Sequence, residues 1–317
     1  MFDRSIPIYL VTGFLESGKT TFADDTLKAP YFATRGRTLV IACEQGEVEY
    51  DTKELKRRHN TEVVYIEEQE DLTTEKLKNL DKKYKPERVL MEYNPLWSVD
   101  KLYEMTLPRY WDWAQHIVII DSSTFQIYSQ NMMPLITEMI RGADMVIFNR
   151  ANEDQPLANF RRSIKVSNGA AQVMFEGEDG EPINIFQDEM PFDLKADVID
   201  IDDVDFGIWY VDMMDNLDRY VGRKVRFKGQ VLKSRKLKAD FFVPGRKAMT
   251  CCAEDVQFIG YVCRYEQAPD LKEGTWVTVE GTVKKEYAEA YREEGPVLYV
   301  GKLETAEAPE DEMVYFT

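Results

Sequence analysis

The most specific chemistry in this sequence lies in eight residues near its start. They read Gly-Phe-Leu-Glu-Ser-Gly-Lys-Thr and end at Thr20, which fits the phosphate-loop pattern G-x-x-x-x-G-K-[ST]. In such a loop, backbone N–H groups surround phosphate oxygens, Lys19 neutralises the β/γ charge and the Thr20 hydroxyl binds Mg²⁺. The octet therefore predicts a site for a nucleoside triphosphate. The expected contact residues are Gly13, Glu16, Ser17, Gly18, Lys19, Thr20 and Thr21.

A triphosphatase also needs a second acid near its magnesium ion. Two apolar runs that read as strands end in a carboxylate, one in Glu92 and the other in Asp121. Because parallel strands present their carboxyl ends at one edge of a sheet, both carboxylates are candidate magnesium ligands. For Asp121, which precedes Ser122 and Ser123, capping of the next helix is an equally good interpretation.

Three of the four cysteines form a second group of residues that could do chemistry. Cys251 and Cys252 are adjacent, and Cys263 follows one predicted strand later. Three thiolates and a nearby carboxylate would suit tetrahedral Zn²⁺. Neighbouring cysteines in an extended segment point to opposite sides, and a free cysteine is also a common core residue. The sequence leaves zinc binding and core packing open.

The elements that position the phosphate loop alternate between short apolar runs and polar helical patterns. Predicted strands cover 6–12, 38–43, 63–66, 88–92, 116–121, 145–149 and 172–175, and helical patterns cover 52–59, 74–84, 124–141 and 156–167. This alternation predicts an α/β domain of the P-loop NTPase type, with a doubly wound, mostly parallel sheet and its ligand at the carboxyl ends of the strands.

The second part of the chain has a different periodicity. After a charged stretch and an apolar helix at 206–220, β-like segments cover 224–232, 240–244, 258–265, 276–284 and 297–304. Five short strands with internal glycines predict a small closed β-barrel of the oligonucleotide/oligosaccharide-binding (OB-like) type. We expect a GTPase-type domain at 1–193, a linker and helix at 194–222, and the barrel at 223–317.

Composition excludes several classes of protein. A net charge of −17 disfavours a nucleic-acid partner, because carboxylates repel phosphate. No apolar run approaches the roughly 20 residues of a membrane span, so the chain is expected not to be embedded in a membrane. The first five residues lead directly into a strand, and the cysteines are too few for a disulfide framework. We therefore expect a cytoplasmic protein with reduced thiols.

The phosphate loop and a second segment together resemble a known family. The segment reads Glu44-x-Gly46-Glu47-x-x-x-Asp51, and with the loop it resembles the cobalamin-biosynthesis-type (CobW/HypB/UreG-like) P-loop GTPases, which include nickel-insertion GTPases and zinc metallochaperones. The resemblance covers roughly the first 190 residues. It implies that 44–51 form the first switch and that Glu92 begins the second. It also implies GTP and Mg²⁺ as cofactors, zinc as cargo, and catalytic roles for Lys19, Glu47 and Glu92.

The sequence departs from that family at three places. The usual Cys-x-Cys-Cys metal motif is absent. The second switch has Pro95 where a glycine N–H normally touches the γ-phosphate, and proline has no N–H. The guanine motif Asn-Lys-x-Asp appears as Asn149-Arg150-Ala151-Asn152, in which the Asn152 amide accepts through one oxygen only. We expect Asn149, Arg150 and Asn152 to contact the nucleotide, with GTP as first choice and ATP as the alternative.

Two functions of different class fit these observations. The first is a GTP-hydrolysing switch with slow turnover that presents a transition metal to a client protein. The second is a nucleotide-binding regulatory module with little hydrolysis that partners a membrane permease. The second is suggested because the last hundred residues, above all those from Arg246 to Cys252, resemble the C-terminal domain of a bacterial family of permease-partner proteins. A small-molecule kinase is a third class, but the sequence shows no base aimed at an acceptor.

Overall fold

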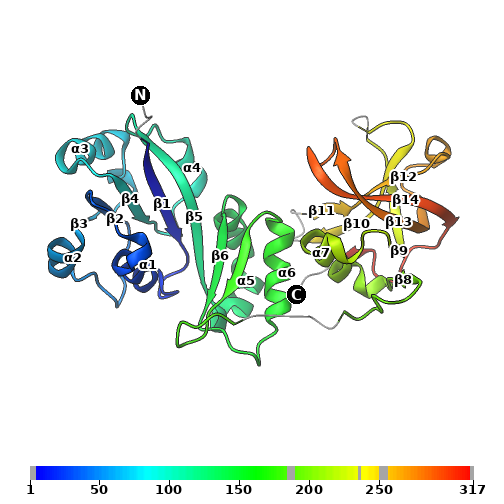
Figure 1. The fold of residues 1–317 in the computed structure, drawn as a ribbon, viewed down its shortest axis with the longest axis horizontal. Helices are drawn as coiled ribbons and strands as arrows, with labels where there is room; N and C mark the ends of the chain where they lie inside the picture. The colour runs from blue at the N-terminus through cyan, green and yellow to red at the C-terminus, as the bar shows by residue number, and fades with distance from the viewer. Residues whose placement is uncertain (1–4, 184–189, 235–236, 250–255, 315–317) are drawn as a thin grey trace. The chain divides into compact units, whose positions relative to one another are not determined.

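The computed structural model describes residues 5–183, 190–234, 237–249 and 256–314 (Figure 1). Contacts divide the chain into two units, each described here by itself. The first consists of Met1–Leu157 and Ala170–Asn184, and the second of Ala158–Gly169 and Ile185–Thr317.

The first unit is built on a parallel sheet of seven strands in the order β3-β2-β4-β1-β5-β6-β7. The strands are β1 Ile6–Thr12, β2 Thr38–Ala42, β3 Thr61–Tyr65, β4 Arg88–Glu92, β5 Trp111–Asp121, β6 Met145–Asn149 and β7 Gln172–Phe175. Both faces of the central strands are apolar, as expected of strands buried on two sides. This confirms the predicted doubly wound α/β domain.

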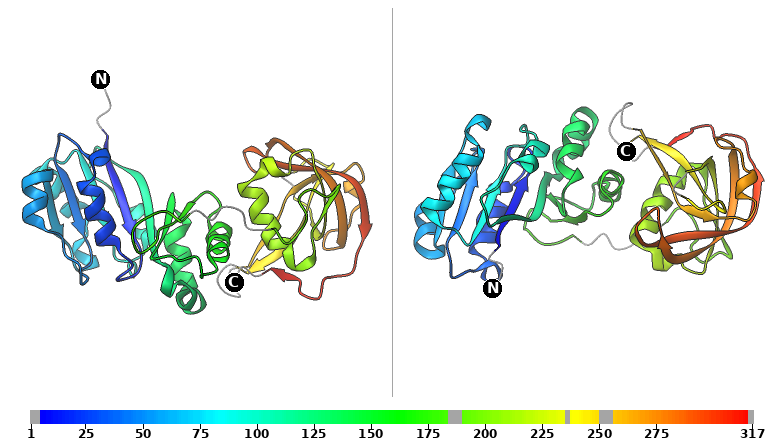
Figure 2. Two further views of the ribbon diagram at one scale, coloured as in Figure 1. Left: turned by 60° about the horizontal axis from the view of Figure 1, so that its bottom comes forward. Right: turned by 90° about the horizontal axis from the view of Figure 1, so that it is seen from above.

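Helices cover both faces of this sheet (Figure 2). They are α1 Lys19–Lys28, α2 Thr52–His59, α3 Thr74–Tyr84, α4 Val99–Glu104 and α5 Ser122–Arg141, with short 3₁₀ turns η1 Pro30–Phe32 and η2 Gln69–Asp71. Leu77 of α3 and Leu102 of α4 belong to one apolar cluster, whereas Leu27 of α1 and Leu55 of α2 belong to another. The sequence did not predict α4, because a six-residue helix has too little periodicity to be recognised.

The order of the strands brings the predicted site residues together. Strand β1 lies between β4 and β5, and Val11 pairs with Glu92 while Thr12 pairs with Val118. The carboxyl ends of these three strands therefore meet where the phosphate loop leaves β1. This is the edge at which open parallel sheets bind their ligands.

The second unit contains a closed barrel. Strands β9, β10, β12, β14 and β13 pair in a ring, because β10 pairs with both β9 and β12. The strands of the unit are β8 Val198–Asp200, β9 Lys224–Leu232, β10 Phe241–Met249, β11 Val256–Gly260, β12 Val262–Arg264, β13 Trp276–Ala288, β14 Glu293–Thr305 and β15 Met313–Val314. The predicted five-strand barrel is confirmed, and Figure 2 shows its strands curving around the core.

Several predicted elements of this unit differ in extent from the structure; the strand predicted at 240–244, for example, continues as β10 to Met249. The single strand predicted at 258–265 is wrong, because Tyr261 separates β11 from β12 and its ring packs inward against Trp209. The helix predicted at 206–220 ends earlier. Here α7 covers Phe206–Asp215, and the Asp212 carboxylate accepts hydrogen bonds from Arg219 and Tyr220, which hold the chain in a following turn.

The remaining elements of the second unit pack on α7 and the barrel. They are α6 Leu157–Ser167 and the 3₁₀ turns η3 Asp203–Asp205, η4 Leu217–Arg219 and η5 Ala268–Asp270. Arg161 and Lys165 of α6 form ion pairs with Asp215 at 2.7 and 2.9 Å. Arg246 of β10 is 2% exposed and pairs with Asp203. Thus α6 is held by charge to the end of α7.

Candidate nucleotide-binding site

The phosphate loop connects β1 directly to α1, and its backbone requires two glycines. Gly13 has φ 145° and Gly18 has φ 101°, where L side chains are strained. A Cβ at Gly13 would lie 2.1 Å from the Ile119 carbonyl oxygen, and a Cβ at Gly18 would lie 2.3 Å from Asn149 Nδ2. Gly18 directly precedes α1, so the unpaired N–H groups of the first turn face the loop.

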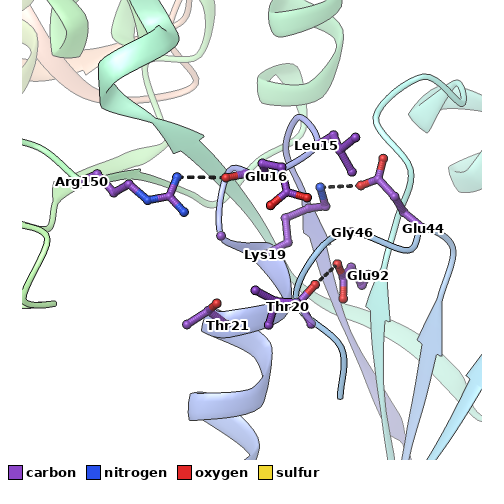
Figure 3. A pocket seen from close by; sticks show the side chains of 11 residues that line it. Leu15, Glu16, Lys19, Thr20, Thr21, Glu44, Gly46, Glu92 and Arg150 are labelled. Atoms are coloured by element: carbon purple, nitrogen blue, oxygen red, sulfur yellow. Dashed lines mark hydrogen bonds and ion pairs between the residues drawn. The ribbon is translucent and has the colours of Figure 1, made fainter. Parts of the chain in front are cut away.

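Lys19 lies inside the loop, and protein oxygens occupy all of its donors. The side chain is buried, and its ammonium group donates to the carbonyl oxygens of Gly13 at 2.8 Å and Phe14 at 2.9 Å. Its third contact is an ion pair of 2.7 Å with Glu44, in the segment that follows β2 (Figure 3). Since an ammonium has three N–H groups, a phosphate that binds Lys19 must displace one of these partners. Glu44 is the partner that is not part of the loop.

A second series of contacts joins Thr20 to Glu92 at the end of β4, and Glu92 to Tyr50 in the predicted first switch. Thr20 Oγ1 donates to Glu92 Oε1 at 2.8 Å, and the Tyr50 hydroxyl donates to Glu92 Oε2 at 2.6 Å. Glu92 is only 3% exposed, and burial raises the pKa of its carboxyl group. A threonine hydroxyl beside a buried carboxylate is an all-oxygen set that suits Mg²⁺. The buried Ser17 hydroxyl, which has no hydrogen-bond partner among the described residues, also fits an oxygen-rich ligand.

The opposite side of the loop is fixed by the loop that follows β6. Asn149 Nδ2 donates to the carbonyl oxygen of Ser17 at 3.0 Å, and Arg150 donates to that of Glu16 at 2.9 Å. Figure 3 shows Arg150 reaching the phosphate loop from the side away from Glu44 and Glu92. Asn149 and Arg150 therefore contact the phosphate loop, and their contact with the nucleotide stays a prediction.

Asp121, Glu47 and Asn152 do not share the opening above the loop with Lys19, Thr20 and Glu92. Asp121 accepts from the Ser123 N–H at 2.8 Å, as a cap of α5 does, and pairs with Arg150. Its observed contacts are therefore those of a helix cap. The Glu47 side chain is exposed. The Asn152 side chain accepts from the Asp154 N–H at 3.1 Å, which places its oxygen in a local turn. Their roles at the nucleotide stay predictions.

The segment after Glu92 forms a closed turn. The Asn94 side-chain oxygen accepts from the Leu96 N–H at 2.9 Å, and the Trp97 N–H donates to the Asn94 carbonyl at 3.1 Å. Pro95 is buried in this turn. Neither Asn94 nor Pro95 borders the opening above the phosphate loop.

Sequence analysis missed the partners that hold the site together. Tyr50 belongs to no motif. The family resemblance places Glu44 in the first switch but does not indicate its contact with Lys19. Their proximity to Lys19 and Glu92 follows from the pairing of β2 with β4, in which Ala42 lies opposite Glu92. Spacing along the chain does not reveal which strands are neighbours in the sheet, and therefore which strand ends lie close together.

The cysteines show a different environment. Cys251 and Cys252 lie outside the described residues. Cys263 is fully buried in the apolar core of the barrel, and burial raises the pKa of its thiol. Among the residues that the structure describes, no group of three His, Cys, Asp or Glu side chains could hold a metal ion. Cys43 is also buried, with a thiol pKa raised to about 12 by burial, as expected of a core residue.

Comparison with known proteins assigns both parts of the chain. Residues 7–175 match the family model described as CobW/HypB/UreG, nucleotide-binding domain. Residues 184–316 match the model described as DUF1980 C-terminal domain. In the described parts of the chain, no helix is long and apolar enough to cross a membrane.

Individual relatives are distant. UPF0703 protein YcgQ of Bacillus subtilis is 25% identical over 96 residues, which are 30% of this chain and 34% of that protein. The chain thus spans about a third of the length of this curated relative. The hydrogenase maturation factor HypB of Archaeoglobus fulgidus has a TM-score of 0.42 at 15% identity, covering 57% of this chain and 85% of that one. Zn(II)-bound YjiA GTPase of E. coli has a TM-score of 0.42 at 20% identity, covering 57% and 60%.

Proposed function

We propose, from the premise that this chain belongs to the CobW/HypB/UreG nucleotide-binding family, that it is a switch protein that binds a magnesium nucleoside triphosphate and hydrolyses it slowly, with GTP as the preferred nucleotide. The observation that carries the proposal is the phosphate loop at the start of α1, with Lys19 inside it and the Thr20 and Glu92 oxygens beside it.

The paired state of these side chains supports a switch. Glu44 holds Lys19, and Tyr50 holds Glu92, so both anchors come from the segment between β2 and α2. Phosphate oxygens would compete with Glu44 for the ammonium group. A magnesium ion held by Thr20 and Glu92 would supply positive charge against the phosphates, and would compete with the Thr20 and Tyr50 hydroxyls for the Glu92 carboxylate. Binding of the nucleotide is therefore expected to release residues 44–50 from their present contacts.

Calorimetric titration tests the proposal directly. The full chain with Mg²⁺ is titrated with GTP, ATP and inorganic tripolyphosphate, and phosphate release is measured in parallel. Replacing Lys19 with alanine should weaken every one of these ligands by roughly a hundredfold, since a charge-assisted contact to phosphate is lost. Lys28→Ala, at the far end of α1, is the matched control and should bind as the parent protein does. Absence of binding by the parent protein would refute the proposal.

A second function is favoured by the turn after Glu92. Pro95 offers no N–H, and the Asn94 side chain is engaged within the turn, so neither residue supplies an obvious γ-phosphate sensor. In this version the protein binds nucleotide, scarcely hydrolyses it, and acts as a regulatory module that docks on a membrane permease through its barrel. Tight binding with negligible phosphate release would select this version over the first.

For the metal, we propose that zinc is the cargo of the switch. The candidate ligands remain Cys251, Cys252 and Cys263. Elemental analysis of the protein as purified, compared with a Cys251→Ser/Cys252→Ser variant, tests this set. Equal zinc content in the two proteins would exclude the two adjacent thiols as ligands.

A further inference from the structure

A second hollow lies on the other side of the phosphate loop, entirely within the first unit. It has a volume of about 540 Å³, which is within the range of small-molecule sites. Gly18 and Thr21 border both this hollow and the opening at the phosphate loop. A nucleotide whose phosphates lie on the loop can therefore place its base and sugar in this hollow.

One wall of the hollow carries an aromatic ring with a free face. Tyr31, in the turn η1 after α1, is 84% exposed. The ring of the neighbouring Phe32 already has partners within the protein. Its centre lies 5.0 Å from that of the Tyr9 ring and 3.7 Å from the Arg88 guanidinium. A tyrosine face is a suitable surface for stacking any nucleotide base.

The other wall carries a carboxylate without a cation. Glu176 follows β7, and its backbone is fixed: its N–H donates to the Phe148 carbonyl and its carbonyl accepts from the Ala151 N–H, both at 2.8 Å. The side chain is half-buried and has no hydrogen-bond or ion-pair partner among the described residues. Burial raises the pKa of this carboxyl group.

We propose, on the premise of the proposed function, that this hollow is the base site, in which Tyr31 stacks on the base and the Glu176 carboxylate selects guanine by accepting its N1–H and N2–H₂ groups. Two oxygens on one carboxylate match two neighbouring donors, as an amide cannot. Adenine presents a ring acceptor in place of N1–H, and its lone pair would face the carboxylate. Glu176 thus offers two acceptor oxygens, whereas Asn152 has one amide oxygen, which already accepts from the Asp154 N–H.

Competition titrations on the full chain with Mg²⁺ test this assignment with four ligands: GTP, ITP, ATP and inorganic tripolyphosphate. ITP keeps the N1–H of guanine but lacks its 2-amino group. The parent protein should bind GTP at least about tenfold more tightly than ATP, with ITP between them, since hydrogen bonds to a charged acceptor are lost stepwise.

Three variants separate the parts of the site. Glu176→Gln should weaken GTP by roughly tenfold and leave ATP and tripolyphosphate within about twofold. Tyr31→Ala should weaken GTP and ATP equally and leave tripolyphosphate unchanged, because stacking does not depend on the base. Glu181→Gln is the matched control, since Glu181 is exposed in the same loop and does not line the hollow.

The outcomes distinguish this inference from the proposed function. If tripolyphosphate binds and the GTP-to-ATP ratio of Glu176→Gln equals that of the parent protein, the assignment of Glu176 is overturned while phosphate binding stands. A parent protein that binds both nucleotides without preference for GTP overturns it as well, together with the proposed preference for GTP, while nucleotide binding itself stands. If the parent protein does not bind tripolyphosphate or any of the nucleotides, the proposed function itself fails.

Discussion

Each unit contains a buried cation held in an ion pair, and the two pairs differ in what surrounds them. Lys19 and Glu44 meet at the edge of an opening, and the lysine is also held by two loop carbonyls. In the second unit, Arg246 is buried while its partner Asp203 is partly exposed, and the guanidinium also donates to the Lys228 carbonyl at 3.1 Å and lies 4.9 Å from the Phe206 ring centre. Glu44 borders an opening that a ligand could enter, whereas the Arg246 guanidinium is held by three oxygens of its own unit.

This difference teaches that the burial of a charge does not by itself indicate a site. The Arg246 pair joins β10 to η3 and stabilises one arrangement of the barrel. The Lys19 pair satisfies a group whose partner, under the proposed function, is a phosphate of the nucleotide. Substitutions at Arg246 and Glu44 test this distinction directly, and substitutions at His116 and Glu16 test other contacts of the first unit.

Arg246→Met should destabilise the second unit by about 3 kcal/mol, because it leaves the carbonyl oxygens of Lys228 and Asp203 without their donor. Urea unfolding measures the change, with hydrogen exchange to assign it to the barrel. Nucleotide binding by the first unit should be unchanged. Lys228→Met, which removes the more exposed cation on Asp203, is the control and should cost less than 1 kcal/mol. Equal costs for the two variants would contradict the structural role of Arg246.

His116 should give the first unit a pH dependence that neither ion pair provides. It lies between Thr12 and Tyr103, each 2.9 Å from a ring nitrogen, and burial lowers its pKa from 6.5 to about 4. Between these values the unfolded chain binds a proton that the folded unit does not, so stability falls as the pH falls. The expected loss is about 2 kcal/mol from pH 7 to pH 5.

Unfolding of the His116→Asn variant at both pH values checks this loss, since the variant should lack this part of the slope. The only other histidine, His59, offers a matched control in His59→Asn, which should keep it. A slope that persists without His116 would assign the pH dependence to carboxylates instead.

Glu44→Gln should raise the affinity for nucleotide by about tenfold, because phosphate no longer displaces a charged partner from Lys19. Tripolyphosphate should gain as much as GTP. Glu49→Gln, on an exposed position of the same segment, should change neither affinity. A weaker affinity in the Glu44→Gln variant would mean that Glu44 assists the ligand rather than competes with it.

The smallest effect is expected at Glu16, which holds φ 62° inside the phosphate loop. A residue with a Cβ is strained there, so Glu16→Gly should be more stable than Glu16→Ala by about 1 kcal/mol. Thermal unfolding of the two variants measures this difference in stability. Because both variants lack the Glu16 carboxylate, its loss does not affect the comparison. Equal stability would indicate that this part of the loop adopts another backbone conformation in solution.

The sequence predicts most of the first unit because its signals are local. The octet ending at Thr20 contains the whole phosphate loop, and the apolar runs define the strands. Glu44 and Tyr50 escape prediction because their contacts depend on which strands are neighbours in space. Tyr31 and Glu176 escape for the same reason, as 145 positions along the chain separate the two walls of one hollow.

The barrel is predicted only in outline. Alternating residues indicate β9, β13 and β14, but the break at Tyr261 depends on its ring packing against Trp209, which no local pattern reveals. The sequence also gives no signal that Ala158–Gly169 packs with the second unit. That contact depends on charges placed far apart, on α6 and at the end of α7.

The placement of α6 has a practical consequence for dissecting the protein. The chain leaves the first unit after Leu157, rejoins it at Ala170 and leaves again after Asn184, so the units share three covalent crossings. A barrel fragment that starts after Asn184 would lack Arg161 and Lys165 and expose Asp215 to water. Removing the barrel from the other side would leave an amphipathic helix without its cover. Each half, expressed alone, should therefore expose a surface that is covered in the full chain, and should aggregate more readily than the full chain does.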